Sequence, residues 1–467
     1  MSKPNLPLKV VTNNYGKEVL DYASERGRQL YTKAVVQFGK GFENVAYQRQ
    51  LLNYLSDDAV LVGFLSVPIC GSDISNILLG YERERIGGNG RSGFDMEGSG
   101  VINGHEALVV VLAAGKNVNL KPGEIHMIQA DMRDFDGLEA VGYRVPGGFR
   151  GLGIYGPHVQ RYFVMVHSPE DGERKLGLIE ASMIENMACI GASHRVGSIR
   201  EDDKTILING GGGNMASLHL KYILSSLAGG GLKSLSKIYL ADVINAGMDR
   251  AIARFGGDFS EYNVELQKIN VSETKLLSVI RPREVNYYIE TVKQFPEQTL
   301  ERCRTIMSDN GMLMAYAGMK RGDGPVVLED GNEYSIGDLH WDGRIAKTNE
   351  GFWITGNTGS TVEDMTTILG MLKARNIYVY DDVGALCGPD AMLEGLHAMH
   401  EKKYQGKIVA LPQYTELPLT DIKGLEAVGS ELKIDWSAED LKDIRAGTMS
   451  RSIDETLLAH FANKKIR

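Results

Sequence analysis

The sequence predicts an α/β protein in which a doubly wound parallel sheet is inserted between β-rich segments. Between residues 204 and 317, short apolar runs alternate with helical patterns, which is typical of a parallel sheet covered on both faces. Before and after this region the pattern is mostly one of short strands and glycine-rich turns. The chain has 467 residues, more than one ordinary hydrophobic core accommodates, so we expect two or three domains.

Composition and charge place the chain among globular proteins and exclude several functions. Hydrophobic residues make up 43% of the chain and charged residues 24%. The formal net charge is −9 and no basic run occurs, which argues against nucleic-acid binding. The longest apolar stretch, residues 107–115, has about half the length that spans a bilayer, so we expect no membrane segment.

The N-terminus and the cysteines indicate the compartment. The stretch MSKPNLPLKVV has no charged region followed by an apolar core and a cleavage site, so we expect no signal peptide. The four cysteines, Cys70, Cys189, Cys303 and Cys387, are scattered and do not form a disulfide framework. We therefore expect a reducing, cytoplasmic compartment.

The N-terminal part of the chain predicts helices followed by strands. Apolar residues at spacings of three and four indicate helices over residues 17–36 and 43–54. Strand patterns follow over residues 59–68 and 106–114, and residues 118–125 read as strand, turn and strand. Two glycine-rich stretches read as irregular structure, and the expected ranges are 82–100 and 143–156.

The central part of the chain supplies the alternating elements. We expect strands over residues 204–209, 237–241, 266–270 and 311–317. We expect helices between them over residues 216–227, 246–255 and 299–308. The alternation ends near residue 377, and residues 406–412 return to strand character.

A dinucleotide fingerprint stands where the first central strand meets its helix. Residues 206–216 read I-L-I-N-G-G-G-G-N-M-A, and Gly211, Gly213 and Ala216 fit G-x-G-x-x-G/A. In this motif the first glycine makes the tight turn, the second admits the pyrophosphate, and the third small residue lets helix and strand pack closely. The pyrophosphate would lie on the N-terminal amides of the helix. A plain strand–turn–helix without a cofactor is the alternative.

The next strand ends in an acidic residue, as a site for NAD requires. Asp242 follows that strand, and its side chain would hydrogen-bond the ribose hydroxyls. It lies further along the chain than the usual spacing of about 20 residues, which an insertion over residues 228–236 explains. A carboxylate there repels the 2′-phosphate of NADP, so we favour NAD. The expected cofactor contacts are Gly211, Gly213, Asn214, Met215 and Asp242.

Potential metal ligands lie outside the dinucleotide region. Cys70, His105, Glu106 and Glu185 supply the sulfur, nitrogen and oxygen donors that zinc accepts. A catalytic zinc needs three protein ligands and an open position, so Cys70, His105 and one of the glutamates suffice. Taken singly, each residue is more typical of an ordinary core or surface position than of a metal ligand, and spacing alone does not decide between the two interpretations.

In combination, these motifs resemble the zinc-dependent medium-chain dehydrogenase/reductase family. The order is C-G-S-D, then G-H-E, then Glu185 in an E-P-like position, then the nucleotide fold. AGKNVNLKPGE at residues 114–124 also matches the family. TGNTGSTVEDM at residues 355–365 and GKIVALPQYTELPL at residues 406–419 resemble its sorbitol dehydrogenase and sorbose-1-phosphate reductase branch.

The resemblance implies the architecture. It implies a GroES-like catalytic domain over residues 1–194 and 376–467, with an N-terminal extension of about residues 1–55. It implies a Rossmann domain over residues 195–375. Relatives form homodimers or homotetramers, so the same is expected here.

The resemblance also implies the activity and the roles of site residues. The expected reaction is hydride transfer between NAD(H) and a small-molecule polyol, sugar alcohol or sugar phosphate, which interconverts a secondary alcohol and a ketone. Cys70, His105 and Glu106 would bind one catalytic zinc, and Glu185 would bind it directly or through water. Ser72 would touch the reacting oxygen, so Ser72 and Glu106 are the expected catalytic residues. Asp73 would orient the ligands.

Three departures from the family pattern bear on this interpretation. Ser75 stands where the family often has a histidine that ends a proton relay. No cysteine lies between Cys70 and Cys189, so we expect no structural zinc. The interval from Cys70 to His105 is long and contains Arg83, Arg85 and Arg91. These arginines suit phosphate recognition, but a solvated loop is the interpretation we favour.

A zinc-free reductase of the same fold and a catalytically inactive, NAD-binding regulatory protein are the alternatives.

Overall fold

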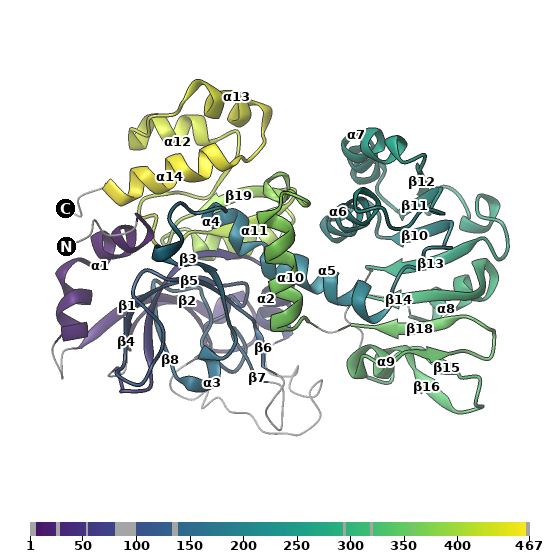
Figure 1. Cartoon of the computed structure of the whole chain (residues 1–467), viewed down its shortest axis with the longest axis horizontal. Coiled ribbons are helices and arrows are strands. Elements are labelled where there is room, and N and C mark those ends of the chain that lie inside the picture. Colours follow the sequence, from purple (N-terminus) through teal and green to yellow (C-terminus); the bar gives the residue numbers. More distant parts are fainter. Residues whose placement is uncertain are drawn as a thin grey trace. The chain divides into compact units, whose positions relative to one another are not determined.

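The computed structural model divides the chain into two compact units (Figure 1). Unit 1 contains Met1–Asn186 and Thr361–Arg467, and unit 2 contains Met187–Ser360. The structure describes residues 6–24, 29–52, 55–79, 100–132, 139–292, 296–317, 321–357 and 359–463. The domain boundaries expected near residues 194 and 375 stay a prediction.

Unit 1 is built on a mixed eight-stranded sheet. Strand β3 (Val60–Pro68) lies at its centre, and every residue of it is buried. It pairs antiparallel with β4 (Leu108–Ala114), β8 (Leu152–Tyr155) and β20 (Lys407–Ala410), so its two sides receive strands from both parts of the chain that form unit 1. The remaining strands are β5 (Ile125–Ile128), β9 (Phe163–His167), β19 (Val383–Cys387) and β21 (Thr420–Asp421).

Helices from both ends of the chain complete unit 1. Helix α1 (Leu6–Ser24) packs against α14 (Arg451–Asn463) and against β4. The absence of a side chain at Gly63 of β3 makes room for Val11 of α1, because a Cβ there would lie 2.8 Å from the valine methyls. The other helices are α2 (Gly71–Leu79), α3 (Pro157–Gln160), α4 (Leu178–Ser182), α10 (Val362–Lys373), α11 (Met392–His400), α12 (Leu425–Leu432) and α13 (Ala438–Ala446). Helix α5 (Ile184–Val196) begins in unit 1 and continues into unit 2.

The predicted N-terminal helices are partly wrong. Helix α1 ends at Ser24, and the chain then forms a hairpin of β1 (Leu30–Gln37) and β2 (Val45–Leu52). Strand β1 also bridges to Arg150 and Val101, so long-range pairing outweighs the local helical spacing. Residues 118–124 are irregular with a turn at residues 122–123, and the strand predicted over 118–125 begins only at Ile125. Residues 139–140 (β7) and 131–132 (β6) add a small hairpin.

Unit 2 has the strand order of a Rossmann domain. Its seven-stranded sheet runs β12-β11-β10-β13-β14-β18-β17, so its first six strands in spatial order follow the chain order 3-2-1-4-5-6. These six strands pair in parallel, and only β17 is antiparallel. Their bounds are β10 (Thr205–Asn209), β11 (Lys237–Asp242), β12 (Glu265–Asn270), β13 (Val285–Glu290), β14 (Met307–Ala315), β17 (Ala346–Lys347) and β18 (Trp353–Gly356).

Helices cover both faces of this sheet, as the alternating pattern predicts. Helices α6 (Asn214–Ala228) and α7 (Asn245–Glu261) pack on the face that includes Ile206 and Ile208. Helices α8 (Pro296–Ile306) and α9 (Ile336–Asp342) pack on the opposite face with Leu207. A hairpin of β15 (Pro325–Val327) and β16 (Glu333–Ser335) precedes α9. Within the residues described here, no helix is both long and apolar enough to cross a bilayer.

Two histidines are buried together in unit 2. His194 of α5 and His219 of α6 lie with Nε2 and Nδ1 3.0 Å apart, and His194 stacks on Tyr222 at a ring distance of 4.6 Å. Burial lowers the pKa of His194 to about 3. Burial, together with His194, also lowers the pKa of His219 well below its usual value. Both rings are therefore neutral in the folded protein at neutral pH.

This pair predicts acid sensitivity. A histidine whose folded pKa is depressed stabilises the fold above its unfolded pKa of about 6.5, and this contribution is lost as the pH falls toward 3. We expect each histidine to lower the free energy of unfolding by on the order of 1 kcal/mol per pH unit below about 6.5. His194→Phe should reduce the loss of thermal stability between pH 7 and pH 5. The exposed control His158→Phe should keep the wild-type dependence, and an unchanged dependence in His194→Phe would contradict the assignment.

Candidate active site

Cys70 stands at the junction between β3 and α2. The strand ends at Pro68 and the helix begins at Gly71, so Cys70 immediately precedes the first turn. The carboxylate of Asp73 accepts a hydrogen bond from the Cys70 backbone N–H at 2.9 Å, which fixes the entry into the helix. The Ser72 hydroxyl lies 3.5 Å from the Cys70 sulfur. The C-G-S-D sequence therefore places a thiol and a hydroxyl together at a helix start.

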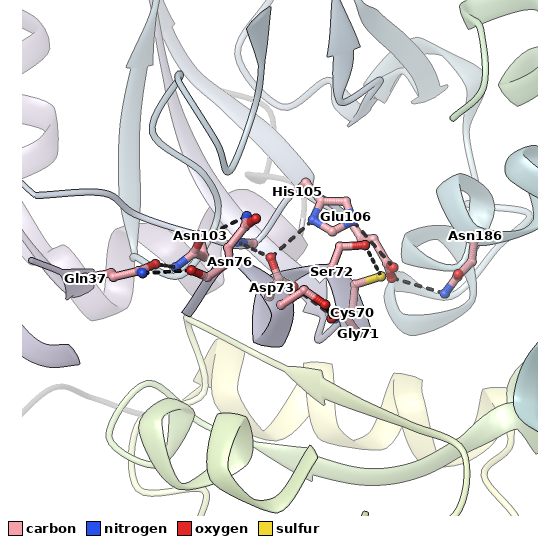
Figure 2. A network of polar contacts seen from close by, with 12 residues as sticks. Gln37, Cys70, Gly71, Ser72, Asp73, Asn76, Asn103, His105, Glu106 and Asn186 are labelled. Atoms are coloured by element: carbon pink, nitrogen blue, oxygen red, sulfur yellow. Dashed lines mark hydrogen bonds and ion pairs between the residues drawn. The ribbon is translucent and has the colours of Figure 1, made fainter. Parts of the chain in front are cut away.

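Asp73 connects this helix start to the segment that carries His105. Its Oδ1 accepts from the Gly104 backbone N–H at 3.0 Å and lies 3.1 Å from His105 Nδ1 (Figure 2). Gly104 has a φ of +93°, a left-handed conformation that favours glycine. Asp73 thereby fixes the orientation of the imidazole and leaves Nε2 facing the Glu106 carboxylate, at 4.0 Å from Oε1.

Buried neighbours shift the pKa values of this pair. Burial alone would raise the pKa of Asp73, but His105 and two backbone N–H groups outweigh it and hold that pKa below its usual value. Burial alone would lower the pKa of His105, but Tyr143, Asp73 and Cys70 outweigh it and raise that pKa well above its usual value. The site thus favours a charged pair.

A set of amide side chains links α2 and the segment that carries His105 to strand β1. Asn103 donates to Gln37 of β1 at 3.0 Å, and Gln37 donates to the Asn76 carbonyl of α2 at 3.0 Å. Figure 2 shows these three side chains beside Asp73, on the side away from Cys70. They join β1, α2 and the G-H-E segment, which the sequence did not indicate.

Glu106 is a buried carboxylate held by a buried lysine. Lys407 of β20 donates to Glu106 Oε1 at 2.6 Å, and Asn186 donates to Oε2 at 3.1 Å. Neither Lys407 nor Glu106 has a side chain more than 4% exposed. Burial raises the pKa of Glu106 above its usual value although Lys407 opposes the shift. Our sequence reasoning missed Lys407, although a lysine inside the apolar strand run G-K-I-V-A-L is itself a signal of a buried partner.

Three of the four expected metal ligands come together. The donor atoms of Cys70, His105 and Glu106 all lie within 4.8 Å of one another. A search of the described residues for three or more His, Cys, Asp or Glu side chains spaced to hold a metal finds this group. Burial would raise the pKa of Cys70, but Lys407 and His105 outweigh it and lower that pKa, which favours the thiolate that zinc binds.

Glu185 lies near this group but outside its compact core. Its side chain is buried at the start of α5, with 4% exposed. Burial, Cys70 and Asp131 raise its pKa, while His105 and Lys407 oppose the shift, so its carboxylate is within electrostatic range of the cluster. Asp131 of β6 and Tyr143, whose ring lies 5.5 Å from that of His105, are further neighbours that the sequence did not single out.

The Ser75 hydroxyl is hydrogen-bonded within its own helix. Its hydroxyl donates to the Gly71 carbonyl within α2 at 2.9 Å, a contact internal to the helix. Arg83, Arg85 and Arg91, considered for phosphate recognition, lie outside the described residues.

The expected dinucleotide residues form a turn at the start of α6 in unit 2. Gly210, with a φ of +80°, makes the left-handed turn after β10. Gly211 lies against β11, where a Cβ would come within 2.8 Å of the Leu240 Cα.

Gly213 caps α6 and is exposed, and Ala216 is fully buried. The first helical residues, Asn214 and Met215, are half-buried. The fingerprint thus lies between a strand and a helix, as its mechanism requires.

Asp242 closes this turn from the end of β11. One carboxylate oxygen accepts from the Gly212 backbone N–H at 3.0 Å. The other accepts from the Val243 and Ile244 backbone N–H groups at 2.7 and 3.2 Å. The acidic side chain therefore lies beside the glycine turn.

Comparison with solved structures identifies the class of fold. The sequence matches no protein-family model and no curated protein sequence. The structure nevertheless aligns with zinc-binding and alcohol-type dehydrogenases that combine a GroES-like unit with a Rossmann unit, which confirms the predicted fold class.

The similar structures include enzymes with different substrates. The chain aligns with 2R,3R-butanediol dehydrogenase from Bacillus subtilis at 16% identity and a TM-score of 0.58, covering 82% of this chain and 99% of that one. It aligns with galactitol-1-phosphate dehydrogenase from Escherichia coli at 16% identity and a TM-score of 0.57, covering 81% and 100%. It also aligns with a zinc-binding dehydrogenase from Sinorhizobium meliloti 1021 bound to NADP, at 14% identity and a TM-score of 0.57, covering 82% and 100%.

The buried pair of Lys407 and Glu106 yields a prediction about stability. Lys407→Met removes the cation and leaves a buried carboxylate unpaired, so we expect the free energy of unfolding to fall by about 3 kcal/mol or more in chelator-treated protein. Glu106→Gln combined with Lys407→Met removes both charges and should restore most of that loss. Denaturant unfolding of the two variants measures this. A double variant as unstable as Lys407→Met would show that the charge pair is not the cause.

Proposed function

We propose that this protein is an oxidoreductase of the medium-chain dehydrogenase/reductase family that transfers hydride between NAD(H) and a secondary alcohol. The observation that carries the proposal is the group of half-buried Cys70 and buried His105 and Glu106, whose donor atoms lie within 4.8 Å of one another. It occurs on a fold shared with solved dehydrogenases. The sorbitol and sorbose-phosphate branch remains the proposed subgroup.

The residues present fit a catalytic zinc. The group offers sulfur, nitrogen and oxygen donors, its thiol favours the thiolate, and Asp73 orients the histidine ring through Nδ1. Cys70, His105 and Glu106 or Glu185 would hold a single ion, which supplies Lewis-acid polarisation of a substrate oxygen. A second, structural zinc is not part of the proposal, because the chain lacks cysteines between Cys70 and Cys189.

The chain's own residues would bind substrate and move its proton. Ser72, beside the Cys70 sulfur, would relay the proton of the substrate hydroxyl during oxidation by accepting it and passing its own hydroxyl proton on, and the relay would run in reverse during reduction. Glu106 is held away from solvent by Lys407 and Asn186, so its carboxylate stays in place as the substrate exchanges. Ser75 donates within its own helix, so the onward proton route would use other groups or water.

The proposed substrate is a polyol, a sugar alcohol or a sugar phosphate. The described neighbours of the cluster include the carboxylates of Asp131 and Glu185, which suit acceptance of hydrogen bonds from substrate hydroxyls. Names of similar structures, such as those of butanediol and galactitol-1-phosphate dehydrogenases, support diols and phosphorylated polyols equally. Homodimer or homotetramer formation stays a prediction.

Metal content and turnover test the function. We expect the wild-type protein to hold about one zinc per chain, with Cys70→Ser and His105→Ala losing both metal and turnover. Cys387→Ser, a buried cysteine of the same unit, serves as the matched control and should retain both. The assay is a polyol and sugar-phosphate panel with NAD and NADP, with and without chelator.

The same panel separates the alternatives. Turnover that survives complete chelation would favour a zinc-free reductase of the same fold. Cofactor binding in calorimetry without turnover on any alcohol would favour a regulatory protein. Full metal content and undiminished turnover in both site variants would overturn the proposal.

Asp242 predicts the choice of cofactor. Its charge beside the glycine turn would repel the 2′-phosphate of NADP, so NAD is the proposed cofactor. Asp242→Asn keeps one acceptor oxygen and removes the charge, and it should raise kcat/KM for NADP relative to NAD by about tenfold. Asp249→Asn, on the adjacent helix α7, is the control and should leave the ratio near that of the wild type. An unchanged ratio in Asp242→Asn would contradict the assignment.

A further inference from the structure

A buried carboxylate on the last helix contacts the segment that leads to Glu185. Asp454 of α14 has 1% of its surface exposed. Its Oδ2 accepts from the Ile179 backbone N–H at 2.9 Å and from the Tyr380 hydroxyl at 2.9 Å. Ile179 belongs to the first turn of α4, so the C-terminal helix supplies an acceptor for a backbone group at a helix start.

The close approach of these groups depends on Gly177. This glycine precedes α4, and a Cβ there would overlap both the Tyr380 hydroxyl and Asp454 Oδ2. Glu180, in the same turn, accepts from the Gly177 N–H at 3.3 Å and pairs with Arg375 at 2.6 Å. The start of α4 is therefore fixed by groups from three later segments of the chain.

The end of α4 connects to the candidate metal site in two directions. Ser182, its last residue, shares a hydrogen bond of 2.8 Å with Ser66 of β3, the strand that leads to Cys70. Two residues further along, α5 begins and carries Glu185. Helix α4 is a single short turn, so a shift at Ile179 reaches Ser182 and Glu185 with little to absorb it.

We propose that Asp454 is a positioning residue that fixes α4 and thereby places the Glu185 carboxylate relative to Cys70 and His105, so that metal affinity depends on the C-terminal helix. This inference rests on the proposed zinc site. It assigns to α14 a role in the site although no residue of α14 belongs to the proposed ligand set.

Within the described residues, one of the two carboxylate oxygens of Asp454 is hydrogen-bonded. Its Oδ1 has no hydrogen-bond partner among the described residues, and burial together with Glu455 raises its pKa to about 7 although Ile179, Arg174 and Tyr380 oppose the shift. The charged and titratable groups around it are Arg174, Tyr380, Tyr414 and Glu455. An apolar residue there would leave the buried Ile179 N–H and Tyr380 hydroxyl without this acceptor, so the carboxylate serves the geometry of α4.

The test measures metal affinity and stability separately. Asp454→Leu removes both acceptor oxygens and adds volume, whereas Asp454→Asn keeps the side-chain size and one acceptor oxygen. Cobalt(II) affinity, from competition with a chelator, and the cobalt–thiolate absorption of Cys70 report on the site. Thermal unfolding of metal-free protein reports on packing. Thr456→Val, on the same helix α14, is the matched control, because it removes a hydrogen bond to Asp440 and not one to Asp454.

We expect Asp454→Leu to bind cobalt about tenfold more weakly and with an altered absorption spectrum, because supporting residues around metal sites contribute about 10–100-fold to affinity. Asp454→Asn should recover most of the affinity, and Thr456→Val should match the wild type. If Asp454→Leu fails to fold, Tyr380→Phe, which removes one donor to the same carboxylate, should show a smaller weakening.

Two outcomes overturn the proposal in distinguishable ways. Unchanged affinity and spectrum in Asp454→Leu and in Tyr380→Phe, with a lower thermal stability of the metal-free protein, would make α14 a structural element only and leave the zinc site intact. Failure of the wild-type protein to bind cobalt would overturn the proposed zinc site itself, and the role of Asp454 with it.

Discussion

The candidate site depends on one buried carboxylate, that of Asp73. It accepts from the backbone at Cys70 and at Gly104 and faces His105, so a single side chain joins the end of β3, the start of α2 and the G-H-E segment. Without this carboxylate, no side chain of the described residues would bind both the backbone at Cys70 and the segment that carries His105, and the two groups would not be held in a fixed position relative to each other. Its burial is tolerated because each contact favours the charged form.

The polar centre of unit 1 is a set of charges that offset one another inside a hydrophobic sheet. Glu106 and Lys407 form an ion pair with almost no exposure, and Glu185 adds a second carboxylate to the same region. Such an arrangement costs desolvation energy and returns no large gain in stability, since apolar replacements of buried pairs are often neutral or stabilising. In the proposed function these carboxylates would face a metal cation, and that is a physical reason to keep the arrangement.

The sequence pattern predicted those elements that are determined by residues close together in the chain. The alternation of strands and helices gave unit 2, and the glycine fingerprint marked the turn before α6, because both follow from residues close together in the sequence. The β1–β2 hairpin was predicted as helix because its pairing to Arg150 and Val101 is long-range. Cys70, His105 and Glu106 were found by motif order. Lys407 was missed because it reaches Glu106 only through the pairing of β20 with β3.

The discontinuity of unit 1 bears on the order in which the chain folds as it is synthesised. Strand β3 pairs with β20, and α1 packs against α14, where Lys9 donates to Asn463 at 2.8 Å. Both partners are synthesised after unit 2. Unit 2 is continuous, so it has all its strands before the last part of unit 1 leaves the ribosome. Until then, β3 has its neighbours β4 and β8 but lacks β20, and α1 lacks the helix it packs against. The first part of unit 1 therefore stays incomplete while unit 2 is being made.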